Sequence, residues 1–267
     1  MFAILVVYIV FLAFPLVWLV STSFKPAVEI FTRQATIFPR RLTLENYRDA
    51  LGEEQILRSV GNSFKVSTLS ALATLGIAMP GAYVLARRQT SVNKLVAGWI
   101  LTSQIFPTIL IIVPLFLLLG RASLVNTHLG LIGVYVVWSL PFVLWMLQGY
   151  VRGVPVELEE AAAVDGANNL QIVSHIVAPL VLPGLVATGL YAFINAWNEF
   201  FFGLVLLKDP DLMTIQVHLA RFRGIEGLAR WGPLAAGSII ATIPSLIVFA
   251  FLQRGLVSGL LSGSVKQ

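Results

Sequence analysis

The chain has 267 residues, of which 57% are hydrophobic and only 12% are charged. Soluble globular domains carry about 25% charged residues, so this composition and a mean hydropathy of +0.86 indicate an integral membrane protein. The absence of cysteine excludes disulfides, thiolate metal sites and cysteine nucleophiles. The net charge of +5 is scattered between apolar runs, which favours loop charges beside membrane spans over a nucleic-acid-binding surface.

Six apolar runs follow one another, and each is long enough to cross about 30 Å of hydrocarbon as a helix. The alternating segments typical of a membrane β-barrel are absent. The first run lacks the basic segment that precedes a signal peptide core, so we interpret it as a retained span. The sequence therefore predicts an all-α integral membrane protein with one transmembrane domain over 1–267 and six spans, at 2–23, 59–86, 95–119, 129–150, 180–207 and 234–252.

Charge gives conflicting signals about orientation. Six spans place both termini on one side of the membrane. A raw count of Lys and Arg opposes cytoplasmic termini, because more of these residues fall in the segments that would then lie outside. The positive-inside rule gives weight to short loops, and the dense cluster of Arg87, Arg88 and Lys94 favours termini inside.

An acidic segment at 154–178 interrupts the apolar pattern and holds Glu157, Glu159, Glu160 and Asp165. Pro155 suits the first turn of a helix, and glutamates near that end suit the positive helix N-terminus. Asp165-Gly166 is a turn signal. The spacing predicts a short helix whose glutamates at 157 and 160 lie opposite an apolar face made of Val154, Leu158, Ala161 and Ala162.

After this turn the sequence predicts a second short helix, with Asn168 or Asn169 as its N-cap. Its expected apolar face is Leu170, Val173, Ile176, Val177 and Leu180. Helices that lie on a lipid surface favour Lys and Arg, and an acidic helix is repelled by anionic lipid. We therefore favour docking into a basic groove of a soluble protein over an amphipathic loop on the lipid surface.

The acidic segment resembles the EAA motif of permease subunits of ATP-binding-cassette (ABC) importers, through Glu160-Ala161-Ala162, Asp165-Gly166-Ala167 and Pro179. Further stretches are similar to the carbohydrate-type branch of that family, and to its second, maltose-type permease. The resemblance covers nearly the whole chain, and the other stretches that carry it are Asn62-Ser63, PGAYVLAR (80–87), IFPTILIIVPLF (105–116), NAWNEF (195–200) and the tail 253–267.

The resemblance implies a multi-pass subunit of a bacterial or archaeal cytoplasmic membrane that forms half of the translocation path for a carbohydrate, a di- or oligosaccharide. The acidic segment would be its coupling loop, docked on a cytoplasmic ATPase, which would place both termini in the cytoplasm. The expected ATPase contacts are Glu157, Glu160, Ala161, Ala162, Asp165, Gly166 and Ala167, with a second contact at Ser262, Gly263 and Lys266. The implied partners are a second, non-identical permease, two ATPase subunits and an extracytoplasmic binding protein.

No phosphate-binding GxxxxGK[ST] loop is present, so ATP and Mg would be bound by the partner ATPase. The sequence predicts no cofactor, metal site or catalytic constellation in this chain. Candidate residues for a polar transport path inside the spans are Gln104, Phe106, Trp138, Asn195, Trp197, Asn198 and Glu199. The alternative hypothesis is an ion-coupled secondary transporter or channel for a small polar solute, with Glu199 and Lys65 as a charge relay.

Overall fold

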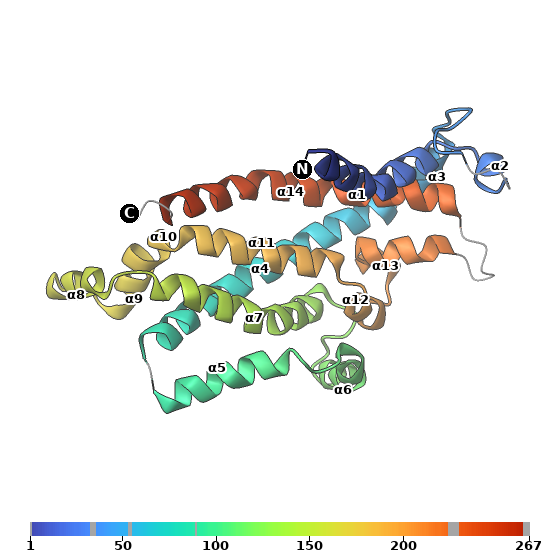
Figure 1. Cartoon of the computed structure of the whole chain (residues 1–267). Coiled ribbons are helices and arrows are strands. Elements are labelled where there is room, and N and C mark those ends of the chain that lie inside the picture. The colour runs from blue at the N-terminus through green and yellow to red at the C-terminus, as the bar shows by residue number, and fades with distance from the viewer. Residues whose placement is uncertain (1, 33–35, 53–54, 89, 224–229, 264–267) are drawn as a thin grey trace. The chain divides into compact units, whose positions relative to one another are not determined.

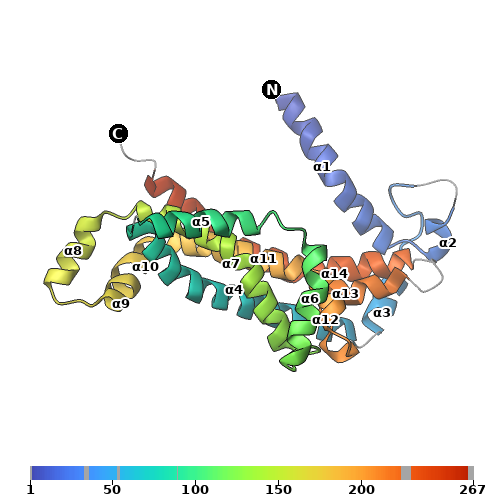
Figure 2. The same ribbon diagram turned by 90° about the horizontal axis from the view of Figure 1, so that it is seen from below.

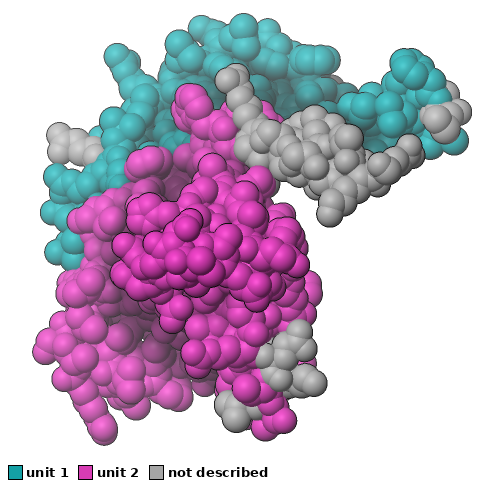
Figure 3. All heavy atoms as spheres, turned by 90° about the vertical axis from the view of Figure 1, so that its left-hand side faces the viewer, with its two compact units in different colours: residues 1–63, 209–245 teal, residues 64–208, 246–267 magenta. Residues whose placement is uncertain are grey.

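The computed structural model describes residues 2–32, 36–52, 55–88, 90–223 and 230–263, and every regular element in these ranges is a helix. The chain divides into two compact units (Figure 3). Unit 1 comprises residues 1–63 and 209–245, and unit 2 comprises residues 64–208 and 246–267. Helices α4 (Gln55–Arg87) and α14 (Trp231–Gly263) each contribute residues to both units.

Unit 1 begins with α1 (Phe2–Ser23). Only 6% of the apolar stretch of this helix is buried, so its side chains make few contacts with the rest of the chain. Short elements complete the unit: α2 (Ala27–Ile30), α3 (Glu45–Gly52), η2 (Pro210–Leu212), α13 (Ile215–Ala220) and η3 (Arg221–Arg223). The side chains of Asn62 and Ser63 hold α4 to the segment at 211–215. Asn62 Nδ2 donates to the carbonyl of Asp211 (2.8 Å), and Ser63 Oγ accepts from the N–H of Ile215 (2.8 Å).

Unit 2 contains the remaining elements in chain order (Figure 1). They are α5 (Ser91–Ser103), α6 (Thr108–Arg121), α7 (His128–Arg152), α8 (Val156–Val164), α9 (Asn169–Gln171), the π-helical turn η1 (Ile172–Val177), α10 (Ala178–Leu180), α11 (Leu182–Asn198) and α12 (Phe201–Leu206).

Helices α7 and α11 pack against each other along unit 2. The α-carbon of Gly184 lies against the ring of Tyr150, so closely that a Cβ at Gly184 would come within 2.4 Å of Tyr150 Cγ. Only glycine permits this approach of the two helices. This close contact fixes the start of α11 against the end of α7, next to the acidic segment.

Four helices of the described residues are long and apolar enough to cross a membrane: Ile4–Ser23, Gln55–Arg87, His128–Arg152 and Trp231–Gln253. A fifth candidate is the bent pair Asn169–Leu180 and Leu182–Asn198, whose two parts meet at 83°. Helices α1, α4, α7 and α14 contain the predicted spans at 2–23, 59–86, 129–150 and 234–252.

Two predicted spans are not continuous helices. The run at 95–119 is divided between α5 and α6, with Gln104 to Pro107 between them. A proline disfavours helical geometry for the residue before it, which ends a helix ahead of Pro107. The run at 180–207 is divided between α11 and α12, because Glu199 is extended (φ −70°, ψ 133°).

Candidate functional site

The acidic segment forms two short helices joined by a tight turn at one end of unit 2 (Figures 1 and 2). Helix α8 ends in a Schellman motif, in which the N–H of Ala167 donates to the carbonyl of Ala162 (2.9 Å) and that of Gly166 to Ala163 (3.1 Å). Gly166 has φ +89°, a left-handed conformation that costs a residue with a side chain about 1–2 kcal/mol. The predicted Asp165-Gly166 turn is therefore confirmed, with Asp165 as the C-cap of α8.

The second helix starts at Asn168, one of the two residues predicted as its N-cap, and the structure adds a capping box with Gln171. Asn168 Oδ1 accepts from the N–H of Gln171 (3.0 Å), and Gln171 Oε1 accepts from the N–H of Asn168 (2.8 Å). The reciprocal bonds satisfy two backbone donors that would otherwise lack partners at a helix start. This rigid start follows Gly166 by two residues, so the chain turns without a loose loop.

The predicted inner face of the second helix is wrong in part. Ile172, Val177 and Val181 are buried, whereas Leu170 is 77% exposed and Leu180 is 52% exposed. The cause is the π-helical turn, in which the N–H of Ala178 donates to the carbonyl of Val173, five residues earlier. A buried pair five residues apart cannot be recognised from α-helical spacing.

The predicted inner face of α8 is also wrong in part. Leu158 is 45% exposed and Ala161 is exposed, although Val154 is buried and Ala162 is half-buried as expected. The inward residue is Glu159, which is 6% exposed. A glutamate can occupy this position because Arg87 and Tyr83 donate hydrogen bonds to it, which apolar patterning does not take into account.

Three donors reach the carboxylate of Glu159, and all come from the C-terminal part of α4. Arg87 donates to Oε1 from Nε (2.8 Å) and from Nη2 (2.5 Å), and Tyr83 Oη donates to Oε2 (2.8 Å). Arg87 Nη2 also donates to the carbonyl of Val154 (2.8 Å), just before α8. Glu159 was absent from the predicted contact residues, and the pairing of Arg87 with this segment is not visible in the sequence.

The remaining predicted contact residues fall into two groups. Glu157, Glu160, Ala161, Asp165 and Gly166 are exposed, whereas Ala162 and Ala167 are half-buried and pack on an apolar cluster. That cluster joins the ends of α4 and α7 to the acidic segment, through Met79, Ala86, Val151, Val154, Ile172, Val177 and Val181. The outer surface of the segment is therefore free to meet another protein while its inner surface is anchored.

The second predicted contact lies at the end of the chain. Ser262 and Gly263 belong to the last turn of α14, and Lys266 lies outside the described residues.

A pocket in unit 2 brings together four of the candidate path residues, Trp138, Asn195, Asn198 and Glu199. Thr108, Ile194 and Phe200 to Phe202 complete its lining. The rings of Trp138 and Phe202 meet edge to face, with centroids 5.8 Å apart. Thr108 and Phe202 were not predicted, because their helices, α6 and α12, exist only through the breaks in two apolar runs.

The other path candidates do not line this pocket. Trp197 is 2% exposed and its ring stacks on Phe193 with centroids 5.7 Å apart, so it serves packing on the inner side of α11. Phe106 is 56% exposed in the link between α5 and α6. Gln104 lies in the same link, and its Nε2 donates to the carbonyl of Trp138 (3.4 Å).

Glu199 joins three elements in addition to lining the pocket. Its carboxylate accepts from Tyr135 Oη (2.8 Å) on α7 and from the N–H groups of Phe202 (2.8 Å) and Gly203 (3.1 Å) on α12. The two N–H groups are among those that the first turn of a helix leaves without intrahelical partners. The position of this acidic side chain inside a predicted span is thus explained first by the break between α11 and α12, whose backbone it caps.

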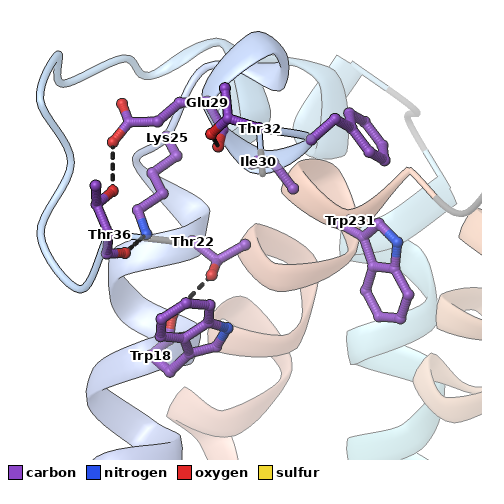
Figure 4. A pocket seen from close by; sticks show the side chains of 9 residues that line it. Trp18, Thr22, Lys25, Glu29, Ile30, Thr32, Thr36 and Trp231 are labelled. Atoms are coloured by element: carbon purple, nitrogen blue, oxygen red, sulfur yellow. Dashed lines mark hydrogen bonds between the residues drawn. The ribbon is translucent and has the colours of Figure 1, made fainter. Parts of the chain in front are cut away.

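Unit 1 holds a separate pocket of mixed character, lined by Trp18, Lys25, Glu29 and Trp231 among others (Figure 4). Lys25 is 3% exposed, lies 4.6 Å from the centroid of the Trp18 ring and donates to the carbonyl of Thr36. Glu29 accepts from the N–H of Arg40 (3.0 Å) and from Thr36 Oγ1 (2.8 Å). The hydrogen bond from Arg40 is the main cause that lowers the pKa of Glu29 from its usual value.

Comparison with known proteins places the chain among membrane transport components. Residues 74–261 match the model of the family described as "Binding-protein-dependent transport system inner membrane component". The ORF1 protein of Streptomyces antibioticus, whose assigned name is that of an ABC transporter permease, is 50% identical over 85% of this chain and 99% of its own length. The trehalose/maltose transport system permease protein MalG of Thermococcus litoralis is 34% identical over 95% of this chain and 91% of its own length.

A solved structure supports the fold. A chain from the crystal structure of a bacterial ABC transporter involved in the import of the acidic polysaccharide alginate superposes with a TM-score of 0.80, at 22% identity, over 94% of this chain and 93% of that one. The fold is therefore that of an ABC importer permease. The chain belongs to the family of binding-protein-dependent transport system inner membrane components, and it is a multi-pass, non-catalytic permease subunit.

Proposed function

We propose that this chain forms half of the translocation path of an ATP-driven importer for a carbohydrate, a di- or oligosaccharide. The main support is the rigid helix pair α8–α9, whose inner surface is anchored to α4 and α7 while its outer surface is exposed. This arrangement occurs in a chain of the permease family. A structure that is fixed on one side and open on the other can transmit a push from a separate subunit.

The outer surface of the acidic segment fits a groove that is basic at its rim and apolar within. Glu157 and Glu160 supply negative charge, and Val164 (88% exposed) and Leu170 (77% exposed) supply apolar contacts on either side of the Gly166 turn. Ala161 leaves room for close approach, whereas Asp165, Ala162 and Ala167 hold the turn. The groove belongs to a cytoplasmic ATPase, so this segment and both termini lie in the cytoplasm.

The six-span topology is part of the same proposal. Helices α1, α4, α7 and α14 each form one span. Helices α5 and α6 together form the third span, and α11 with α12 forms the fifth. The 83° bend before α11 then allows α9 and α10 to run across the direction of that span, outside the hydrocarbon. The end of α14 and the residues after it, Ser262 to Gln267, provide a second ATPase contact.

The pocket beside α7, α11 and α12 suits a sugar. Asn195, Asn198 and Thr108 offer groups that exchange hydrogen bonds with hydroxyls, and Trp138 and Phe202 offer aromatic surface for the C–H faces of a sugar ring. Relatives of this chain include a permease named for trehalose and maltose transport. We therefore place part of the substrate path at this pocket.

The importer requires other chains for binding and for energy. A second, non-identical permease completes the channel, two ATPase subunits bind ATP and Mg, and an extracytoplasmic binding protein delivers the sugar. The family description itself names dependence on a binding protein.

The variant Glu160→Lys tests the coupling role directly. Placing like charges together at an interface costs several kcal/mol, so we expect ATPase association to weaken roughly a hundredfold. Association is measured by co-purification from membranes, and uptake of trehalose and maltose is measured in vesicles with and without a protonophore. The matched control is Glu45→Lys, the same charge reversal on the exposed surface of α3 in unit 1.

The expected result is membrane insertion without ATPase association for Glu160→Lys, and normal association for Glu45→Lys. Normal association and uptake by Glu160→Lys would contradict the coupling role. Uptake that collapses with the proton gradient and needs no ATPase would favour the ion-coupled alternative instead.

A further inference from the structure

The contact between Arg87 and Glu159 is the most enclosed ion pair among the described residues. Only 15% of the Arg87 side chain and 8% of the Glu159 side chain are exposed. The other two ion pairs seen in the described ranges, Arg58–Asp211 and Arg230–Asp49, have side chains that are half or more exposed. Exposed pairs contribute little to stability, whereas an enclosed pair that loses one partner leaves an uncompensated charge.

The donors around Glu159 are arranged so that both carboxylate oxygens are satisfied. Oε1 receives two N–H groups of the Arg87 guanidinium, and Oε2 receives the hydroxyl of Tyr83. Arg87 uses a further hydrogen bond to hold the Val154 carbonyl. Four hydrogen bonds therefore fix both the start of α8 and its fourth residue to the last two turns of α4.

Both covalent routes out of α8 contain non-helical links. The chain reaches α7 through Gly153 to Pro155, and it reaches α11 through the Gly166 turn, a π-helical turn and the 83° bend at Val181. Each is a place where the helical hydrogen-bond ladder changes or stops. The route through Glu159 instead leads directly to Tyr83 and Arg87 on α4, a single helix of 33 residues that contains Pro80.

We propose that Glu159 and Arg87 are positioning residues that make α8 and the C-terminal end of α4 move as one body, so that a push on the acidic segment is delivered to α4. This inference rests on the proposed coupling function and deepens it. Glu160 faces the partner ATPase, whereas the adjacent Glu159 passes the movement inward. Two N–H groups of one planar guanidinium that donate to the same carboxylate oxygen suit this role, because they fix orientation as well as distance.

The inference predicts a fixed distance that can be measured with spin labels. The chain has no cysteine, so cysteines at Val84 on α4 and at Ala163 on α8 give two unique labels, because both residues are exposed and neither is a proposed ATPase contact. The assembled complex is measured by double electron–electron resonance without nucleotide and with ATP and vanadate. We expect one narrow distance distribution that does not shift between the two states.

Glu159→Gln removes the charge that holds Arg87 while preserving the shape of the side chain. We expect the label distribution to broaden and to shift when ATP and vanadate are added, whereas ATPase association is retained. The matched control is Glu45→Gln, the same change at an exposed glutamate on α3 in unit 1, for which the distribution stays narrow. A role in folding alone would reduce assembly and would not produce a nucleotide-dependent shift.

The alternative results are decisive. A nucleotide-dependent shift in the wild type, or a fixed distance in Glu159→Gln, overturns the inference. If Glu159→Gln does not assemble, Arg87→Lys replaces it, because lysine keeps the charge but loses the planar pair of N–H donors. A shift in Arg87→Lys supports the inference, and a fixed distance overturns it. If neither variant assembles, the pair serves folding and the inference is wrong.

Failure of the proposed function is recognised separately. A wild-type complex without an ATPase, or normal ATPase association by Glu160→Lys, would refute the coupling role itself. A wild-type complex that holds its ATPase, together with an unaltered Glu159→Gln, would refute only the connection to α4.

Discussion

The carboxylate of Glu199 has two roles at the scale of a single residue. It lines the pocket, and it accepts one hydrogen bond from Tyr135 and two from the backbone of α12. Hydrogen bonds to charged groups each contribute about 1.5–3 kcal/mol to stability. A variant at this position therefore affects both packing and transport, and the two effects must be separated.

Glu199→Gln and Tyr135→Phe together separate these effects. Glutamine keeps the size of the side chain but presents an NH2 donor where a backbone N–H also donates, so we expect a loss of about 2 kcal/mol. Tyr135→Phe removes one hydrogen bond and leaves the carboxylate in place. The measurements are the thermal midpoint of the purified complex and relative uptake rates for a panel of sugars.

We expect both variants to lower the midpoint and only Glu199→Gln to change the relative uptake rates. Identical sugar preferences in both variants would assign Glu199 to structure alone.

Short elements decide how the acidic segment is built. Its turn could be predicted, because Asp-Gly and a following Asn are local signals whose geometry depends on a few neighbouring residues. Its inner faces could not be predicted completely. Glu159 lies inward because of Arg87, 72 residues away in the chain, and Ile172 lies inward because a π-helical turn changes the spacing.

Gly166→Ala tests the turn at the scale of the element. The left-handed conformation at φ +89° disfavours any side chain, so we expect a loss of about 1–2 kcal/mol in local stability. Hydrogen exchange of the Ala167 amide, which donates to Ala162, reports the opening of the Schellman motif. Gly61→Ala in α4 is the control, because open space surrounds its α-carbon and alanine favours a helix.

Faster exchange at Ala167 in Gly166→Ala, with unchanged exchange in Gly61→Ala, is the expected result. Equal protection of Ala167 in both variants would mean that the turn tolerates a side chain.

At the scale of the whole molecule, the helical class and the positions of four long helices could be predicted from hydropathy. Hydropathy follows the average over about 20 residues, and that average is high for α1, α4, α7 and α14. Hydropathy does not detect a break in the helix where the flanking residues stay apolar, as at the links that contain Pro107 and Glu199. Those links create α6 and α12, and with them two walls of the pocket.

The π-helical turn at Ile172–Val177 makes one part of the chain tolerant of a change in length. A π-helical turn is equivalent to an α-helical turn with one inserted residue, so deletion of the exposed Ser174 restores an ordinary turn and leaves the flanking faces nearly in phase. Deletion of Leu158 instead rotates one side of α8 relative to the other by about 100°. Co-purification with the ATPase should therefore survive the first shortening and fail after the second.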